Sequence, residues 1–146
     1  MNTNLQGIKR FVWAGAGAAA IVLAGCAGMS SNKGVQVTLS GASEVPPVAT
    51  SASGSGTIMV GDDKSISGSV TTSGVAGLAA HIHTGAAGAN GPVTIPLAKT
   101  ADNVFSVPAG AKFTDEQYNT YKAGGMYINV HSAANKGGEI RGQLKP

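Results

Sequence analysis

From Val35 onward the chain alternates short β-prone runs with clusters of Gly, Pro, Asn and Ser, and this pattern constrains its fold most. Several runs alternate apolar and polar residues with a period of two, as in Val35-x-Val37-x-Leu39. Turn-forming pairs such as Asn90-Gly91 separate the runs. Eight short strands at this spacing predict an all-β fold, either a Greek-key sandwich or a barrel. We expect the strands at residues 35–39, 56–60, 65–72, 78–84, 92–97, 104–108, 126–132 and 139–144.

One segment departs from the β pattern. Thr114 is followed three residues later by Gln117, and this pair has the form of a helix capping box. Two tyrosines then follow at helical spacing, before a Gly-Gly pair that favours the end of a helix. The sequence therefore predicts one short helix at residues 115–123, which crosses from one strand to the next.

The first 25 residues have the features of a bacterial lipoprotein signal peptide. Lys9 and Arg10 precede an apolar stretch of about 15 residues, which suits a secretory signal and falls short of the roughly 20 residues that span a membrane. The stretch ends in Leu-Ala-Gly-Cys26, which resembles the lipobox, whose Cys receives a diacylglyceryl group. We expect a signal peptide at residues 1–25, lipidation of Cys26 with acyl chains such as palmitate, and a lipidated tether at residues 26–34. The alternatives are an ordinary signal peptide with an incidental Cys, or a short membrane anchor.

A lipid anchor would place the folded part in the cell envelope, on a membrane surface outside the cytoplasm. Ala27, and not Asp, follows the lipidated Cys, which by the sorting rule of these lipoproteins indicates the outer membrane, facing the periplasm, if the cell is Gram-negative. Cys26 is the only Cys, so the mature protein has no free thiol for catalysis or metal binding. Lys9 and Arg10 are two of ten basic residues, and the other eight nearly balance seven acidic ones, so we expect no nucleic-acid binding.

All three histidines of the chain lie in two predicted strands, His81 and His83 in one and His131 in the other. Residues i and i+2 of a strand face the same way, so His81 and His83 project together, and Asn129 shares a face with His131. If the two strands are neighbours, three imidazoles converge in a site that suits Zn²⁺ or copper and leaves one coordination position open. The alternative is a polar seam, in which the histidines only hydrogen-bond their neighbours and fix the strand register.

Three more polar residues, Asn129, Glu44 and Glu139, are candidates for orienting the metal ligands. Glu44 and Glu139 are also the carboxylates to test as a general base, and a purely structural role is the alternative for both. Glu139 and Arg141 lie two residues apart on one predicted strand, where they would form an exposed ion pair worth under about 1 kcal/mol.

Three segments of the chain, in this order, resemble the CHRD domain, a family named after its repeats in the animal protein chordin and also found singly in bacterial secreted proteins. They are LSGASEVPPVATSASGSG, GLAAHIHTGAAGANGPV and AGGMYINVHSAANKGGEIRGQL. The resemblance identifies residues 35–146 as one CHRD domain, and it implies an immunoglobulin-like or superoxide-dismutase-like fold. It implies little about activity, because most bacterial members have no assigned role. Copper–zinc dismutases use more than three histidines, so their activity does not follow from a similar fold.

These expectations favour a lipid-anchored binding protein of the cell envelope that does no chemistry of its own and binds copper or zinc through His81, His83 and His131. Its expected partners are the membrane, reached through the lipid, a metal ion and an envelope protein. The second hypothesis is a structural or adhesive envelope domain without metal. The third is a small metalloenzyme, in which a metal held by the three histidines polarises a water molecule.

Overall fold

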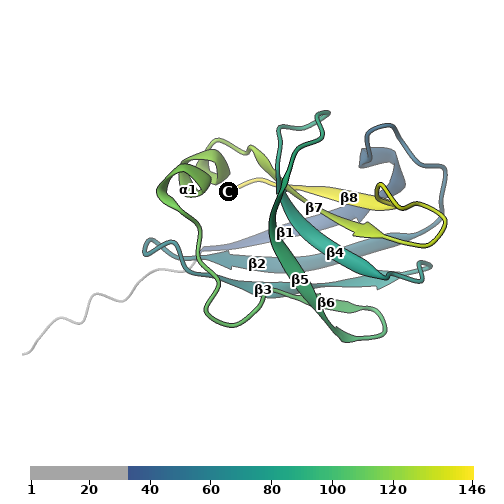
Figure 1. Ribbon diagram of the computed structural model, residues 1–146, viewed down its shortest axis with the longest axis horizontal. Coiled ribbons are helices and arrows are strands. Elements are labelled where there is room, and N and C mark those ends of the chain that lie inside the picture. The colour runs from purple at the N-terminus through teal and green to yellow at the C-terminus, as the bar shows by residue number, and fades with distance from the viewer. Residues whose placement is uncertain (1–32) are drawn as a thin grey trace, which may run out of the picture.

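The computed structural model describes residues 33–146, which form eight strands, one α-helix and one 3-10 turn (Figure 1). The predicted signal peptide, the lipidation site Cys26 and most of the predicted tether lie outside the described residues. Within residues 33–146, none of the helical segments is both long and apolar enough to cross a membrane. The strands are β1 (Lys33–Ser40), β2 (Ser53–Val60), β3 (Ile66–Ser73), β4 (Ala79–Thr84), β5 (Val93–Ala101), β6 (Val104–Ser106), β7 (Met126–His131) and β8 (Ile140–Leu144).

The strands close into an antiparallel barrel, in the order β1-β2-β3-β6-β5-β4-β7-β8. Strand β3 lies beside β6, and not beside β4, which is a Greek-key arrangement. Of the two predicted architectures, the barrel is therefore the one that the chain adopts. Each predicted strand corresponds to an observed strand with shifted ends. For example, β6 ends at Ser106 and not at residue 108, because Pro108 has no N–H to extend the ladder.

The interior of the barrel is filled by the alternate apolar residues of its strands, among them Val35, Val37 and Leu39, as their period of two predicts. Strand β7 departs from this alternation, because its outward-facing Tyr127 and Asn129 are as buried as its inward-facing residues. Two loops account for their burial. Residues 85–92 hydrogen-bond Tyr127, and residues 132–139 hydrogen-bond Asn129 and His131. The outer face of β7 is therefore enclosed, and the candidate site lies there.

The predicted helix is confirmed as α1 (Asp115–Lys122), which connects β6 to β7. The Thr114 hydroxyl accepts a hydrogen bond from the Gln117 N–H at 3.2 Å, and the Gln117 amide oxygen accepts one from the Thr114 N–H at 2.8 Å. These two bonds form the capping box that the sequence predicts. The buried ring of Tyr121 packs 5.9 Å from that of Phe113, so the helix covers one end of the core. The sequence did not indicate the 3-10 turn η1 (Gly41–Ser43).

Candidate metal centre

Strands β4 and β7 are antiparallel neighbours, and their register brings the three histidines to one outer patch of the barrel. Ala79 pairs with His131, His81 with Asn129, and His83 with Tyr127. Side chains of i and i+2 residues share a face, so His81, His83 and His131 all project outward around Asn129. The predicted convergence of the three imidazoles is confirmed.

The nitrogen atoms of the three imidazoles are close enough to share an ion. One nitrogen from each ring lies within 4.8 Å of the other two, and His81 Nδ1 is 2.9 Å from His131 Nε2. The ring centroids of His81 and His131 are 4.8 Å apart, whereas that of His83 lies 5.6 Å and 6.2 Å from them. A tetrahedral ion with bonds of about 2.0–2.1 Å separates its ligand atoms by about 3.3 Å. The widest nitrogen pair would have to close and the 2.9 Å pair of His81 and His131 would have to open slightly to hold such an ion.

Backbone carbonyls determine which ring nitrogens carry hydrogen. His83 Nδ1 lies 2.9 Å from the Gly91 carbonyl oxygen, and His131 Nδ1 lies 2.9 Å from that of Lys136. Because a carbonyl only accepts, both Nδ1 atoms must donate, and both Nε2 atoms of the neutral rings are left with a lone pair. His131 Nε2 accepts a hydrogen bond from His81 Nδ1. A carbonyl that fixes the tautomer of a histidine in this way is typical of metal ligands.

The lone pair of His83 Nε2 has no partner. The side chain of His83 is 8% exposed, and Nε2 is buried without a hydrogen bond to any described residue. Only two other buried side-chain atoms in the described part of the chain share this property, Glu44 Oε1 and Asn129 Oδ1. Buried polar atoms without partners are uncommon in proteins and require an explanation such as a bound ion or water.

Tyr127 of β7 and Arg141 of β8 stack in succession beside His83. The sequence pattern did not predict this role for either residue. The Tyr127 ring stacks on the His83 ring with an interplanar angle of 5° and a centroid distance of 4.8 Å. The Arg141 guanidinium lies 3.3 Å from the centroid of the Tyr127 ring. Arg141 is 1% exposed and donates hydrogen bonds to the carbonyl oxygens of Ala86 and Ala89. It therefore holds the 85–92 loop, whose Gly91 orients His83.

The predicted exposed ion pair between Glu139 and Arg141 is wrong, because both residues are buried and satisfied elsewhere. Glu139 accepts a hydrogen bond from Thr50 at 2.9 Å. Hydrogen bonding with Ser132 is the main cause that holds the pKa of its carboxyl below the ordinary value, and Thr50 and Asn135 add to it. Glu139 therefore anchors the loop after β7, and none of its described hydrogen bonds reaches an imidazole.

Glu44 is buried near Asn129, under the 132–139 loop. Its side chain is 5% exposed, and burial raises the pKa of its carboxyl, although the charge of Arg141 acts in the opposite direction. A Cβ added at Gly138 would collide with Glu44 Oε1 and lie 2.7 Å from Asn129 Nδ2. Glu44 and Asn129 therefore share one buried neighbourhood under the 132–139 loop. Of the three residues expected to orient the ligands, Asn129 is the one beside the histidines.

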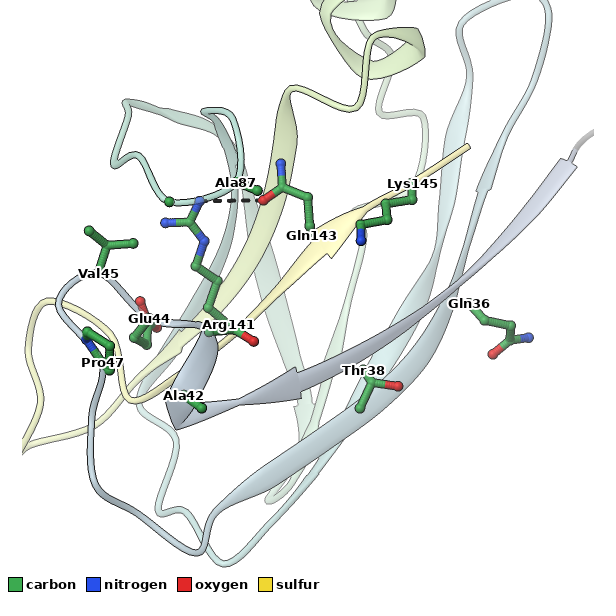
Figure 2. A pocket seen from close by; sticks show the side chains of 12 residues that line it. Gln36, Thr38, Ala42, Glu44, Val45, Pro47, Ala87, Arg141, Gln143 and Lys145 are labelled. Atoms are coloured by element: carbon green, nitrogen blue, oxygen red, sulfur yellow. Dashed lines mark hydrogen bonds between the residues drawn. The ribbon is translucent and has the colours of Figure 1, made fainter.

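A cleft of about 690 Å³ lies on the β1–β8 side of the same outer face. Figure 2 shows Glu44 and Arg141 together on its wall, with Gln143 hydrogen-bonded to Arg141. None of the three histidines lines this cleft, so it is separate from the imidazole cluster. Its lining residues are Gln36, Thr38, Ala42, Ser43, Glu44, Val45, Pro47, Ala87, Gly88, Arg141, Gln143 and Lys145.

Burial disfavours the charged forms of His81 and His83. It is the main cause that lowers the pKa of His81 and of His83 below the ordinary 6.5. Positive charge on the neighbouring histidines lowers both pKa values further, whereas the hydrogen bond to Gly91 acts in the opposite direction on His83. Metals bind the neutral form of imidazole, so the site favours the state that a metal requires.

These pKa directions predict how stability depends on pH. A folded-state pKa below 6.5 means that the unfolded chain binds more protons as the pH falls through 6.5. We expect the metal-free protein to lose stability between pH 7 and pH 5, which thermal unfolding in EDTA measures. Glu44, with its raised pKa, opposes this trend at the acid end of the range. This loss of stability should be smaller in a His81→Gln/His83→Gln variant. An equal loss of stability in that variant would show that groups other than these two histidines cause it.

Comparisons with known proteins agree with the extent of the fold. The family model described as CHRD domain matches residues 35–144. A search of curated proteins and a search of solved structures each found no match. The matched residues include all eight strands apart from the first two residues of β1, and they include all three histidines.

Proposed function

The chain belongs to the CHRD domain family, and we propose that this member is a lipid-anchored binding protein of the cell envelope that holds one Cu²⁺ or Zn²⁺ ion through His81, His83 and His131. One observation carries the proposal. Nitrogens of the three imidazoles lie within 4.8 Å of one another, and the buried Nε2 of His83 has a lone pair without a partner. An ion at this point would bind that lone pair and replace the hydrogen bond between His81 and His131, provided that the proton of the neutral His81 ring moves from Nδ1 to Nε2.

The chemistry of the ligands favours copper or zinc. Neutral imidazole suits Zn²⁺ and Cu²⁺, whereas Mg²⁺ and Ca²⁺ take oxygen ligands. Two of the rings are already held by the backbone carbonyls of Gly91 and Lys136, so binding orders few further side chains. The site is therefore largely preorganised for a metal with three nitrogen ligands.

The proposed location depends on the N-terminal sequence. The lipobox-like segment that ends at Cys26, together with Ala27, supports lipid anchoring in the envelope, at the outer membrane if the cell is Gram-negative. The protein would then hold its metal at a membrane surface, for exchange with an envelope protein. Metabolic labelling with a fatty acid tests the anchor, since label should be lost in a Cys26→Ser variant.

Calorimetric titration with Zn²⁺ and Cu²⁺ tests the proposed function. The protein should be prepared without a histidine tag and with Cys26→Ser, so that the three histidines supply the only imidazoles and no thiol competes. We expect saturable binding of one ion per chain at pH 7.5, lost in His81→Ala and in His131→Ala. An Asn119→Ala variant, altered at an exposed position of α1, should bind as the parent does. Binding that is absent, or that persists in both histidine variants, would contradict the proposal.

A second candidate function is a structural or adhesive envelope domain in which the histidines form a hydrogen-bonded seam. The bonds from His81 to His131, from His83 to Gly91 and from His131 to Lys136 favour this alternative, because they link two strands and two loops without any metal. It predicts that His81→Ala lowers the melting temperature whether or not metal is present. It also predicts that a chelator leaves the melting temperature of the parent protein unchanged.

We also propose that the protein carries out no chemistry of its own. A metal-activated water needs a general base within hydrogen-bond reach. Glu139 is engaged with Thr50 and Ser132, and Glu44 lies against Gly138 in the neighbourhood of Arg141. Neither carboxylate is placed at an imidazole by the contacts of the described residues. The metalloenzyme alternative predicts metal-dependent hydrolysis of an activated ester, lost in Glu44→Gln.

A further inference from the structure

Asn129 stands at the centre of the imidazole cluster. It pairs directly with His81 across the two strands, and it lies two residues from His131 on the same face of β7. Its side chain also interacts with His83, which is diagonal to it in the sheet. Asn129 is 2% exposed, so whatever its polar atoms bind must be inside this cluster or in the loop that covers it.

The amide of Asn129 has a defined orientation. Its Nδ2 donates a hydrogen bond to the Gly137 carbonyl oxygen at 3.3 Å, so the nitrogen faces the 132–139 loop. Oδ1 is consequently the other end of the amide, and it is buried without a partner among the described residues. The close approach of Gly138, with φ of +132° and no Cβ, lets the loop backbone cover the amide in this orientation.

Two acceptor atoms therefore share one buried space. His83 Nδ1 donates to Gly91, so the interaction of His83 with Asn129 is through Nε2, whose lone pair faces an amide oxygen that also only accepts. While the His83 ring is neutral, neither atom can satisfy the other, and burial disfavours the protonated ring that could donate to Oδ1. Leaving a buried acceptor unpaired is unfavourable, and a cation between the two atoms would remove the cost for both.

We propose that Asn129 Oδ1 is the fourth ligand of the metal, so that His81, His83, His131 and Asn129 form a closed site of three nitrogens and one oxygen. This inference rests on the proposed function and replaces the open coordination position expected from the three histidines alone. Four protein ligands around a tetrahedral ion are typical of sites that hold a metal, whereas catalytic sites keep one position for water. The closed set therefore predicts a metal-holding site that small anions do not enter.

Access of azide to the bound metal tests this ligand directly. The Cys26→Ser protein without a tag is loaded with Co²⁺, which takes the tetrahedral geometry of Zn²⁺, and titrated with azide, which changes the visible absorption of Co²⁺ when it reaches a vacant position. We expect no azide complex in the parent protein and a saturable one in Asn129→Ala. The matched variant Asn119→Ala, at an exposed position of α1, should behave as the parent does. Because Asn129→Ala also opens space beside the metal, its azide result is interpreted together with the zinc affinities of Asn129→Asp and Asn129→Leu.

A second readout does not depend on removing the side chain. Asn129→Asp keeps the shape and offers a charged oxygen, so it should bind Zn²⁺ at least about tenfold more tightly than the parent, whereas Asn129→Leu should bind at least about tenfold less tightly. In the parent, Zn²⁺ should shift the side-chain carbonyl resonance of Asn129 and leave that of Asn119 in place.

The possible failures are distinguishable. Azide binding to the cobalt-loaded parent, or equal affinity for Zn²⁺ in Asn129→Asp and Asn129→Leu, would overturn the assignment of Asn129 and leave the three-histidine site standing. Absence of saturable metal binding in the parent would overturn the proposed function, and the fourth ligand with it.

Discussion

Free Zn²⁺ at one hundred times the dissociation constant of the site is expected to raise the melting temperature of the protein by about 10 °C. A ligand that binds only the folded state at this excess adds about 2.7 kcal/mol to the free energy of unfolding. For a domain of roughly 110 residues, each kcal/mol raises the melting temperature by about 4 °C. The site can deliver this effect because its ligands come from β4 and β7, which are adjacent only in the folded barrel.

The same measurement separates the metal site from the hydrogen-bonded seam. Thermal unfolding should be followed in Zn²⁺ and in EDTA, with the tag-free Cys26→Ser protein and with its His131→Ala variant. We expect the zinc-dependent rise to vanish in His131→Ala, because that variant loses one ligand and the partner of His81 Nδ1. A parent protein that melts at the same temperature in both solutions would support the seam and refute the metal site.

The convergence of the histidines could be predicted because it depends on a local rule that applies to each of the two strands. A strand places i and i+2 residues on one face, so the pattern His81-x-His83 and the Asn129-x-His131 pair each define a face without knowledge of the fold. The remaining assumption was that the two strands are neighbours, and the Greek-key order β5-β4-β7 satisfies it. The capping box of α1 was predictable for the same reason, since Thr114 and Gln117 are three residues apart.

The supporting contacts could not be predicted, because they depend on the paths of loops. The sequence pattern places Tyr127 on the same face as Asn129, but nothing in it indicates that this outer face is enclosed. Arg141 was expected in an exposed ion pair, whereas it is buried over the Tyr127 ring and bonded to carbonyls of the 85–92 loop. Carbonyl oxygens belong to every residue, so no residue type in the sequence marks Gly91 or Lys136 as the groups that orient histidines.

Gly91 connects the stability of the barrel to the geometry of the candidate site. Its carbonyl oxygen accepts from His83 Nδ1 at 2.9 Å, and its N–H donates to the Tyr127 hydroxyl at 3.2 Å. A Cβ at this position would collide with the carbonyl oxygen of Thr84, at the end of β4. The collision is with backbone and not with the tip of a flexible side chain, so the 85–92 loop itself would have to move.

Gly91→Ala should therefore lower both stability and metal affinity. Forcing a methyl group into this contact is expected to cost about 2–3 kcal/mol, seen as a fall of about 10 °C in the melting temperature of the metal-free protein. Displacing the carbonyl that orients His83 should weaken Zn²⁺ binding by about 10- to 100-fold in calorimetry. Asn119→Ala, at an exposed position of α1 away from the site, is the control and should change neither quantity. Normal zinc affinity in a destabilised Gly91→Ala would show that His83 does not depend on this carbonyl for its orientation, and that the loop supports only the barrel.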